Sequence, residues 1–199
     1  MLAELFKDKH IILGSASPRR KFFLEELGLD FEIRLKEVAE HYPENLVREQ
    51  ISDYLAELKA KPFLDELTDK DILITSDTIV WLKNKALGKP ADSEDARSML
   101  KALSGNTHEV ISSVAVTTHR ETHIIHDATQ VTFKNLSDPE IDYYISNFKP
   151  FDKAGAYGIQ EWIGYIGITR IEGSYFTVMG FPVQKFYELM MKIQFANNR

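Results

Sequence analysis

The sequence predicts an α/β protein, because strand-like segments alternate with segments of helical periodicity along its 199 residues. The apolar run Ile11–Leu13 predicts a strand that leads directly into a helix. A long β-branched run follows at Asp71–Lys83, and two strand patterns at Glu109–Thr117 and Thr122–Phe133 predict a hairpin. We expect residues 1–199 to form a single domain, with either one core or two lobes that share a cleft.

The composition is that of a globular protein, with 44% hydrophobic and 27% charged residues. The formal net charge of −6 argues against a nucleic-acid partner, because such binding needs many basic contacts to phosphates. The absence of cysteine excludes disulfides, thiolate catalysis and zinc sites of the cysteine type. No apolar run approaches the roughly 18 residues of a membrane span. We therefore expect a cytoplasmic protein without a membrane partner.

The segment Gly14–Arg20 predicts a helix start that binds an anion. Ser17 is the expected N-cap and Pro18 the expected first helical residue. The exposed N–H groups and dipole of a helix N-terminus attract anions, and Arg19 and Arg20 add two permanent positive charges. Phosphate is the leading candidate, and the alternative is an ordinary strand-to-helix turn with solvated arginines. The segment is no P-loop, because no Gly-Lys-Ser/Thr follows.

The next part of the chain predicts a helix that stops at Gly28 and then a strand, a polar loop and an amphipathic helix. These three elements are expected over Leu29–Leu35, Lys36–Pro43 and Glu44–Lys61. The loop carries Glu40, which could lean back towards the first helix. Pro62 ends the long helix, and Lys59 lies at the edge of its buried stripe. A surface lysine that packs its stem is the simpler interpretation of Lys59.

Asp77 is the strongest single candidate for a site residue. It interrupts the apolar run Asp71–Lys83 in the middle, where a buried carboxylate costs several kcal/mol unless a cation or metal binds it. Either Asp77 ends one strand and opens into a cleft, or a neighbouring cation holds it. The turn Asn84–Pro90 follows and carries Lys89.

The second half of the chain contains two well-marked helix starts and a glycine-rich segment. Asp92 or Ser93 should cap a helix that runs to Leu103, and a capping box at Ser137 opens a helix that ends before Pro150. The segment Asp152–Gln160 is either a tight turn or a loop that lets backbone approach a ligand. Two strands and a last helix are expected over Ile163–Ile171, over Ser174–Met179 and from Pro182 onward.

Five of these stretches, in this order and spacing, resemble the Maf proteins, a family of nucleoside triphosphate pyrophosphatases. They are Ser15–Arg20, Ser76–Val80, Gly88–Pro90, Leu103–Gly105 with Thr107 and His108, and Lys153–Gln160. The resemblance covers nearly the whole chain. It implies an α/β fold of the Maf/ITPase-like type, with an elongated mixed β-sheet flanked by helices and two lobes around a central cleft.

The resemblance also implies roles for individual residues. The phosphates would be bound by Ser15, Arg19 and Arg20. The catalytic group would consist of Glu40, Lys59, Asp77 and Lys89, with Asp77 as the proton acceptor. The base would be selected by Arg19, Thr78 and Gln160. Hard oxygen ligands suit Mg²⁺ or Mn²⁺, so Asp77 and Glu40 are the expected ligands of a divalent metal cofactor, and Asp77 could serve either as metal ligand or as base.

Asp77-Thr78 and the segment Ala156–Gln160 resemble the branch of the family that acts on dTTP and UTP. The resemblance implies that modified pyrimidine triphosphates are substrates as well. Two departures are Ser76, where this branch more often has alanine, and the bulky acidic pair Glu161-Trp162 at the expected edge of the base pocket. The alternatives are the sister branch, which acts on 7-methyl-GTP, and a non-catalytic nucleotide-binding regulator of cell division. The resemblance, together with the general abundance of two-fold assemblies, leads us to expect a homodimer.

Overall fold

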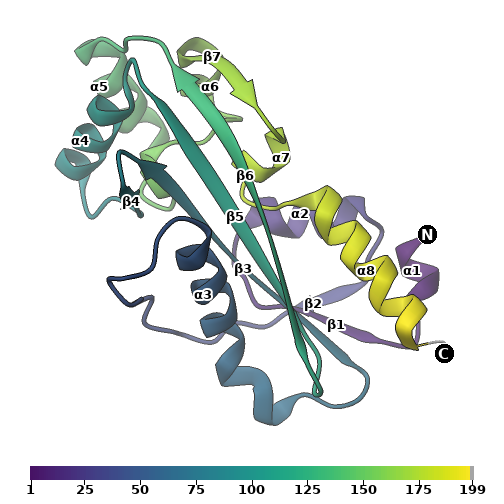
Figure 1. Cartoon of the computed structure of the whole chain (residues 1–199). Coiled ribbons are helices and arrows are strands. Elements are labelled where there is room, and N and C mark those ends of the chain that lie inside the picture. Colours follow the sequence, from purple (N-terminus) through teal and green to yellow (C-terminus); the bar gives the residue numbers. More distant parts are fainter. Residues whose placement is uncertain (198–199) are drawn as a thin grey trace. The chain divides into compact units, whose positions relative to one another are not determined.

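The computed structural model describes residues 1–197, with side chains as far as Ile193, and these residues form two compact units (Figure 1). Unit 1 comprises Met1–Asp77, Ser112–Asp127 and the segment from Gly180 onward. Unit 2 comprises Thr78–Ile111 and Ala128–Met179. Within the described residues, seven strands pair in the order β2-β1-β3-β5-β6-β7, and β4 pairs with β3. The boundary between the units therefore crosses the strands.

Three long strands contribute to both units, namely β3 (Asp71–Leu82), β5 (Thr107–Thr117) and β6 (Thr122–Phe133). Figure 1 shows them as the longest arrows of the molecule. The hairpin between β5 and β6 was predicted from sequence, and its turn is closed by the Thr118 N–H, which donates to the Glu121 carbonyl at 2.9 Å. Alternating patterns thus located the strands that organise the sheet.

In unit 1, the remaining elements are α1 (Leu2–Leu5), β1 (His10–Leu13), α2 (Pro18–Glu26), β2 (Phe31–Ile33), α3 (Glu49–Ala60), the 3₁₀ helix η1 (Lys61–Glu66) and α8 (Val183–Asn197). β1 pairs in parallel with both β2 and β3, in a register that sets Leu13 opposite Ile74. The core here includes Ile12 of β1, Leu73 of β3 and Phe63 of η1. Each of these side chains has less than 3% of its surface exposed.

In unit 2, the remaining elements are β4 (Lys85–Leu87), α4 (Ser93–Leu103), α5 (Asp138–Phe148), the 3₁₀ turn η2 (Ala154–Ala156), α6 (Trp162–Gly167), β7 (Ile168–Glu172) and α7 (Tyr175–Val178). β4 pairs with β3, and β7 with β6, in the antiparallel sense. Leu100, Phe133 and Tyr144 belong to its buried core. Parallel and antiparallel pairs in one sheet confirm the predicted mixed sheet and the α/β class.

The predicted helix starts are confirmed. Ser17 is the N-cap of α2, Pro18 is its first residue, and the Ser17 hydroxyl accepts the Arg20 N–H at 3.5 Å. Asp92 caps α4 by accepting the Asp95 N–H at 2.9 Å, and Ser137 opens α5 with the capping box. These local signals depend on neighbouring residues, which is why the sequence alone located them.

Three predicted elements differ from the structure near the sites of interest. The helix expected from Glu44 begins only at Glu49, because Arg48 has a φ of 52°, and Val47 is 48% exposed outside it. The turn expected at Asn84–Pro90 contains the short strand β4. The strand β3 runs through Asp77 without a break, so the interpretation of Asp77 as a strand end is wrong.

Of the two strands expected at Ile163–Ile171 and Ser174–Met179, the first is confirmed only from Ile168 onward and the second is wrong. The first segment begins as the helix α6 and becomes strand β7 only at Ile168, and the second is largely the helix α7. A short apolar run cannot distinguish a buried helical turn from a strand. Gly164 permits the helical turn, because a Cβ there would lie 1.9 Å from the Ile159 carbonyl oxygen. Within residues 1–197, we find no helix that is both long and apolar enough for a membrane span.

Candidate functional site

Asp77 faces helix α3, because of the alternation of side chains along β3. Thr75 and Asp77 are two residues apart and so share one face of the strand. The Thr75 hydroxyl donates to the Ala56 carbonyl at 2.7 Å, and the Lys59 ammonium donates to Asp77 Oδ1 at 2.5 Å. Ala56 and Lys59 are three residues apart on α3 and therefore also share a face. The periods of the strand and the helix thus bring the predicted lysine to the predicted aspartate.

Lys59 joins two carboxylates that are far apart in sequence. Its Nζ lies 2.5 Å from Asp77 Oδ1 and 3.2 Å from Glu40 Oε1. Asp77 is 6% exposed, whereas 42% of the Glu40 side-chain surface is exposed. Burial raises the pKa of Asp77 above its usual range, and the charges of Lys59 and Arg20 oppose that shift. The alternative in which a cation holds Asp77 is confirmed, and the interpretation of Lys59 as a solvated surface lysine is wrong.

Arg20 is held by three oxygens in the first turn of α2. Its Nη1 donates to Ser15 Oγ at 3.2 Å and to the Ser76 carbonyl at 2.8 Å, and its Nε donates to the Gly180 carbonyl at 3.2 Å. Burial lowers the pKa of Arg20 to about 10, so the guanidinium stays charged at neutral pH. Arg19 is half-buried at the preceding position, and its charge also lowers the pKa of Arg20. Unit 1 thus contains Ser15, Arg19 and Arg20 together with Asp77 and its partners Lys59 and Glu40.

The other predicted site residues belong to unit 2. Thr78 follows Asp77 in β3 and is half-buried. Lys89 is exposed in the segment after β4, and the preceding Gly88 carbonyl accepts the Gly155 N–H at 3.0 Å. Gln160 is half-buried, and its Oε1 is buried without a hydrogen-bond partner among the described residues.

The glycine-rich segment is a compact turn. Gly155 has a φ of 67°, and a Cβ there would lie 2.8 Å from Val80 Cγ2, so the position needs glycine for both reasons. The Tyr157 hydroxyl and His108 Nε2 are 2.7 Å apart in a buried hydrogen bond, and the Tyr157 ring packs edge-on to Phe133 at 5.1 Å. Burial lowers the pKa of His108 to about 4, so this imidazole is neutral at pH 7.

Sequence reasoning did not predict the contacts by which three side chains hold this segment. The Tyr144 hydroxyl donates to Glu161 Oε2, and Lys153 Nζ lies 3.1 Å from Glu161 Oε1. A sequence signal for this contact was present. Lys153 stands directly before a run of small residues that predicts burial, and a buried lysine needs a carboxylate partner. Tyr144 gave no comparable signal, because it belongs to the ordinary apolar stripe of α5.

The predicted metal ligands are together, but a lysine lies between them. Among the described residues, no three His, Cys, Asp or Glu side chains cluster as a metal site. Asp77 and Glu40 instead share the ammonium of Lys59. Mg²⁺ is commonly bound by one or two carboxylates together with phosphate oxygens of the substrate. The donor chemistry of this pair therefore fits such an ion.

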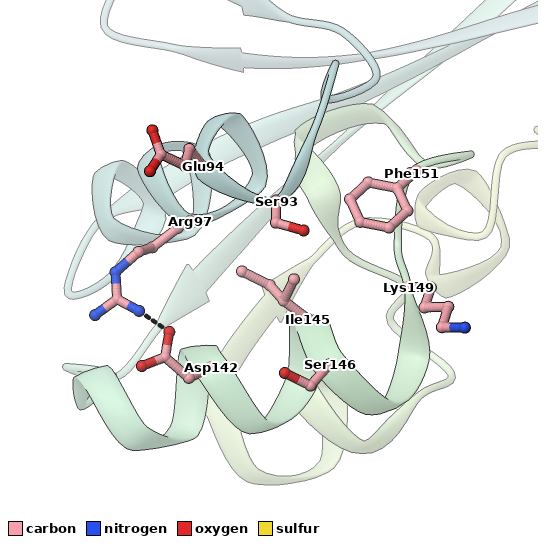
Figure 2. A pocket seen from close by; sticks show the side chains of 8 residues that line it. All are labelled: Ser93, Glu94, Arg97, Asp142, Ile145, Ser146, Lys149 and Phe151. Carbon is pink, nitrogen blue, oxygen red and sulfur yellow. Dashed lines mark ion pairs between the residues drawn. The ribbon is translucent and has the colours of Figure 1, made fainter.

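A pocket of about 380 Å³ in unit 2 lies apart from the predicted chemistry (Figure 2). Its lining comes from α4, α5 and the segment that follows, and comprises Ser93, Glu94, Arg97, Asp142, Ile145, Ser146, Lys149 and Phe151. The Arg97 guanidinium pairs with Asp142, as the dashed line in Figure 2 marks, and lies 3.3 Å from Asp138. None of the predicted site residues lines this pocket. Because the arginine of this pocket is paired with two carboxylates, we assign the pocket no part in phosphate binding.

Comparison with known proteins identifies the relatives of this chain. Residues 10–193 match the family described as Maf-like protein. A dTTP/UTP pyrophosphatase of Flavobacterium johnsoniae is 57% identical over 96% of this chain and 98% of its own length. One of Flavobacterium psychrophilum is 55% identical over 98% of this chain and 100% of its own.

Among solved structures, a nucleoside-triphosphatase / dITP/XTP pyrophosphatase of Mycobacterium abscessus shows a distant likeness. Its TM-score is 0.43 at 15% identity, over 96% of this chain and 97% of that chain. The assignment rests instead on the family match over most of the chain and on relatives of more than 50% identity. The chain belongs to the Maf family.

Proposed function

We propose that this protein is a nucleoside triphosphate pyrophosphatase that hydrolyses dTTP and UTP, and their modified forms, to the nucleoside monophosphate and pyrophosphate. The observation that carries the proposal is the buried contact between Asp77 and Lys59, with Arg20 fixed nearby. A hydrolase needs such a carboxylate among cations, whereas a protein that only binds nucleotides does not. The relatives named dTTP/UTP pyrophosphatase support the substrate.

In this proposal the cations bind the triphosphate. Arg19 and Arg20 bring two guanidinium charges to the phosphates, and Ser15 contributes a hydroxyl beside Arg20. Lys59 of unit 1 and Lys89 of unit 2 are the further cations proposed for phosphate binding. The three oxygens around Arg20 keep its guanidinium in place before the substrate arrives, which reduces the cost of ordering it on binding.

Asp77 is the proposed proton acceptor. Its raised pKa makes it a better base than an ordinary aspartate, because basicity rises with pKa. A water oxygen attacks the α-phosphorus, the bond from that phosphorus to the α–β bridging oxygen breaks, and pyrophosphate leaves with the bond's electron pair. The water proton passes to Asp77. The arginines and lysines stabilise the negative charge that develops on the leaving group.

As the alternative to its role as base, Asp77 would join Glu40 in holding a divalent metal, Mg²⁺ or Mn²⁺, together with oxygens of the triphosphate. Such an ion would supply charge neutralisation at the reacting phosphates. Lys59 already holds the two carboxylates together, so both are in place before a metal binds.

Gln160, with Arg19 and Thr78, is the proposed base-selecting group. The buried Gln160 Oε1 has no protein partner among the described residues and can accept one hydrogen bond. Thymine and uracil offer an N3–H donor, whereas N3 of cytosine is itself an acceptor. A base without the donor leaves a buried acceptor unpaired, which costs about 1–3 kcal/mol. The proposed site therefore favours dTTP and UTP.

A single assay tests this function. We would measure pyrophosphate release from dTTP, UTP, dCTP, dATP, GTP and 7-methyl-GTP, each with and without Mg²⁺. We expect metal-dependent release that is fastest with dTTP and UTP. Preference for 7-methyl-GTP would assign the protein to the sister branch, and the absence of pyrophosphate release from every triphosphate would contradict the hydrolase and favour a nucleotide-binding regulator.

The proposal also covers the oligomeric state and the cellular compartment of the protein. We propose that the protein acts in the cytoplasm and forms a homodimer, as two-fold assemblies are the commonest oligomers. Light scattering coupled to size-exclusion chromatography measures the mass directly. A mass near the 22.9 kDa of one chain would contradict the dimer.

A further inference from the structure

We propose that Glu161 is a positioning residue that fixes Gln160 through Tyr144 and Lys153, and thereby sets the preference for bases with an N3–H donor. This inference rests on the proposed function of Gln160. Glu161 directly follows Gln160 in the chain, and its carboxylate contacts Tyr144 and Lys153.

A closed ring of hydrogen bonds joins the residues on either side of Gln160 in the chain. The Gly158 N–H donates to the Tyr144 hydroxyl oxygen at 3.1 Å, and the Tyr144 hydroxyl donates to Glu161 Oε2. Burial and the Glu161 carboxylate raise the pKa of Tyr144, so its phenol stays protonated and keeps donating. The Glu161 N–H also donates to the Gly158 carbonyl at 3.0 Å. Residues 158 and 161 are thus joined twice, and Gln160 lies between the two junctions.

Lys153 requires the charge of Glu161 as well as its shape. The Lys153 side chain is 9% exposed, and its ammonium contacts Glu161 at 3.1 Å and Asp152 at 2.7 Å. Asp152 is largely exposed and its charge is screened by water, so Glu161 supplies the more buried of the two charges that compensate the ammonium. A neutral side chain at position 161 would leave Lys153 poorly compensated.

The space beside Gly158 is filled by the same ion pair. A Cβ at Gly158 would lie 2.9 Å from Glu161 Cδ and 3.1 Å from Lys153 Cε. A larger residue here would therefore displace the ends of the Glu161 and Lys153 side chains. The segment is also anchored on its other side, because Ile159 is 4% exposed and the Tyr157 hydroxyl is bonded to His108.

This arrangement explains how Gln160 can present an acceptor that is already out of water. A mobile loop would turn the unpaired Oε1 to solvent, whereas the ring holds residues 158–161 in one conformation. A base with an N3–H then binds an acceptor that needs little further ordering or desolvation. Loss of the ring should therefore affect discrimination between bases more than the chemical step.

The test compares Glu161→Ala and Glu161→Gln with the wild type. For each we would measure kcat and KM for dTTP and for dCTP. Glu161→Ala should raise KM for dTTP about tenfold, change kcat far less, and reduce the kcat/KM ratio of dTTP to dCTP about tenfold. Glu161→Gln still accepts from Tyr144 but lacks the charge, so it should restore part of the ratio. An unchanged ratio in both variants would overturn the proposal.

A matched control is Glu172→Ala, which removes another glutamate of unit 2 whose side chain is 63% exposed and pairs with the exposed Arg170. It should leave the ratio unchanged. The melting temperature of each variant shows whether it folds. If Glu161→Ala does not fold, Glu161→Gln is used for the test instead.

Binding of thymidine and cytidine triphosphate analogues with a non-hydrolysable α–β bridge, measured by calorimetry, separates this inference from the proposed function. A wild type without turnover would contradict the hydrolase, while the ratio of the two dissociation constants would still report on Gln160. We expect that ratio to shrink about tenfold in Glu161→Ala. A wild type that binds both analogues equally would overturn the role of Glu161.

Discussion

The two units hold their candidate site residues in different ways. In unit 1 the charged side chains project from regular elements, with Asp77 on β3, Lys59 on α3 and Arg20 on α2. In unit 2, Gln160 lies outside any helix or strand, on a segment that Glu161 and its partners hold in place. The first arrangement fixes side chains by secondary structure, and the second fixes backbone by side chains. Substitutions should therefore act directly on the chemistry in unit 1 and indirectly, through neighbours, in unit 2.

The largest effect is expected at Asp77. Asp77→Asn removes the proposed proton acceptor while its amide oxygen can still accept from Lys59, so pyrophosphate release from dTTP and UTP should fall by about 10³-fold or more. The melting temperature should change little. Retained turnover in a folded variant would show that the base lies elsewhere.

The next effect concerns the stability of unit 2 at acidic pH. The pKa of His108 falls from 6.5 to about 4 on folding, so between these values the unfolded chain binds a proton that the folded chain does not. Stability should therefore decrease as the pH falls from 6.5 to 4, by about 3 kcal/mol, and His108 should contribute no pH dependence above that window.

His108→Gln keeps a side chain that can bond to the Tyr157 hydroxyl but does not titrate. Urea unfolding of the wild type and this variant at pH 7.0, 5.5 and 4.5 isolates the contribution of His108. The carboxylates of the chain titrate in both proteins, so their contribution cancels in the comparison. Parallel pH dependences in the two proteins would contradict the buried neutral imidazole.

A smaller effect is expected at Lys89, which is exposed. Lys89→Ala should lower kcat/KM for dTTP by roughly tenfold, as expected for the loss of one charge-assisted phosphate contact. Lys85→Ala removes another exposed lysine from the neighbouring strand β4 and serves as the control. Equal activities of the two variants would remove Lys89 from the site.

The smallest effect compares the helix caps of the two units. Asp92 accepts the Asp95 N–H at 2.9 Å, whereas Ser17 accepts the Arg20 N–H at 3.5 Å. Asp92→Ala should lower the free energy of unfolding by about 1 kcal/mol, and Ser17→Ala by less, because the longer hydrogen bond is weaker. Chemical denaturation measures both. The reverse order would mean that Ser17 stabilises its helix by more than this hydrogen bond.

The sequence predicted features that depend on neighbouring residues or on a general cost of burial. Asp77 was identified because a carboxylate in an apolar run needs a partner. That its partner is Lys59 depended on how α3 packs on β3, which no local pattern encodes. Glu161 was expected at the edge of a base pocket, and its contact with Tyr144 crosses 17 residues and two elements. The first half of the strand expected from Ile163 is instead helical, because its apolar pattern fits a buried helix as well.

The pleat of β3 has a consequence for folding. A slip of one residue against its neighbours would turn Ser76 and Thr78 towards α3 and send the Asp77 carboxylate to the opposite face, away from Lys59. Such a misaligned chain would bury an uncompensated charge, and Thr75 would lose its bond to the Ala56 carbonyl. The side chain proposed for catalysis thereby also penalises wrong strand pairing and widens the energy gap between the native sheet and its misregistered competitors.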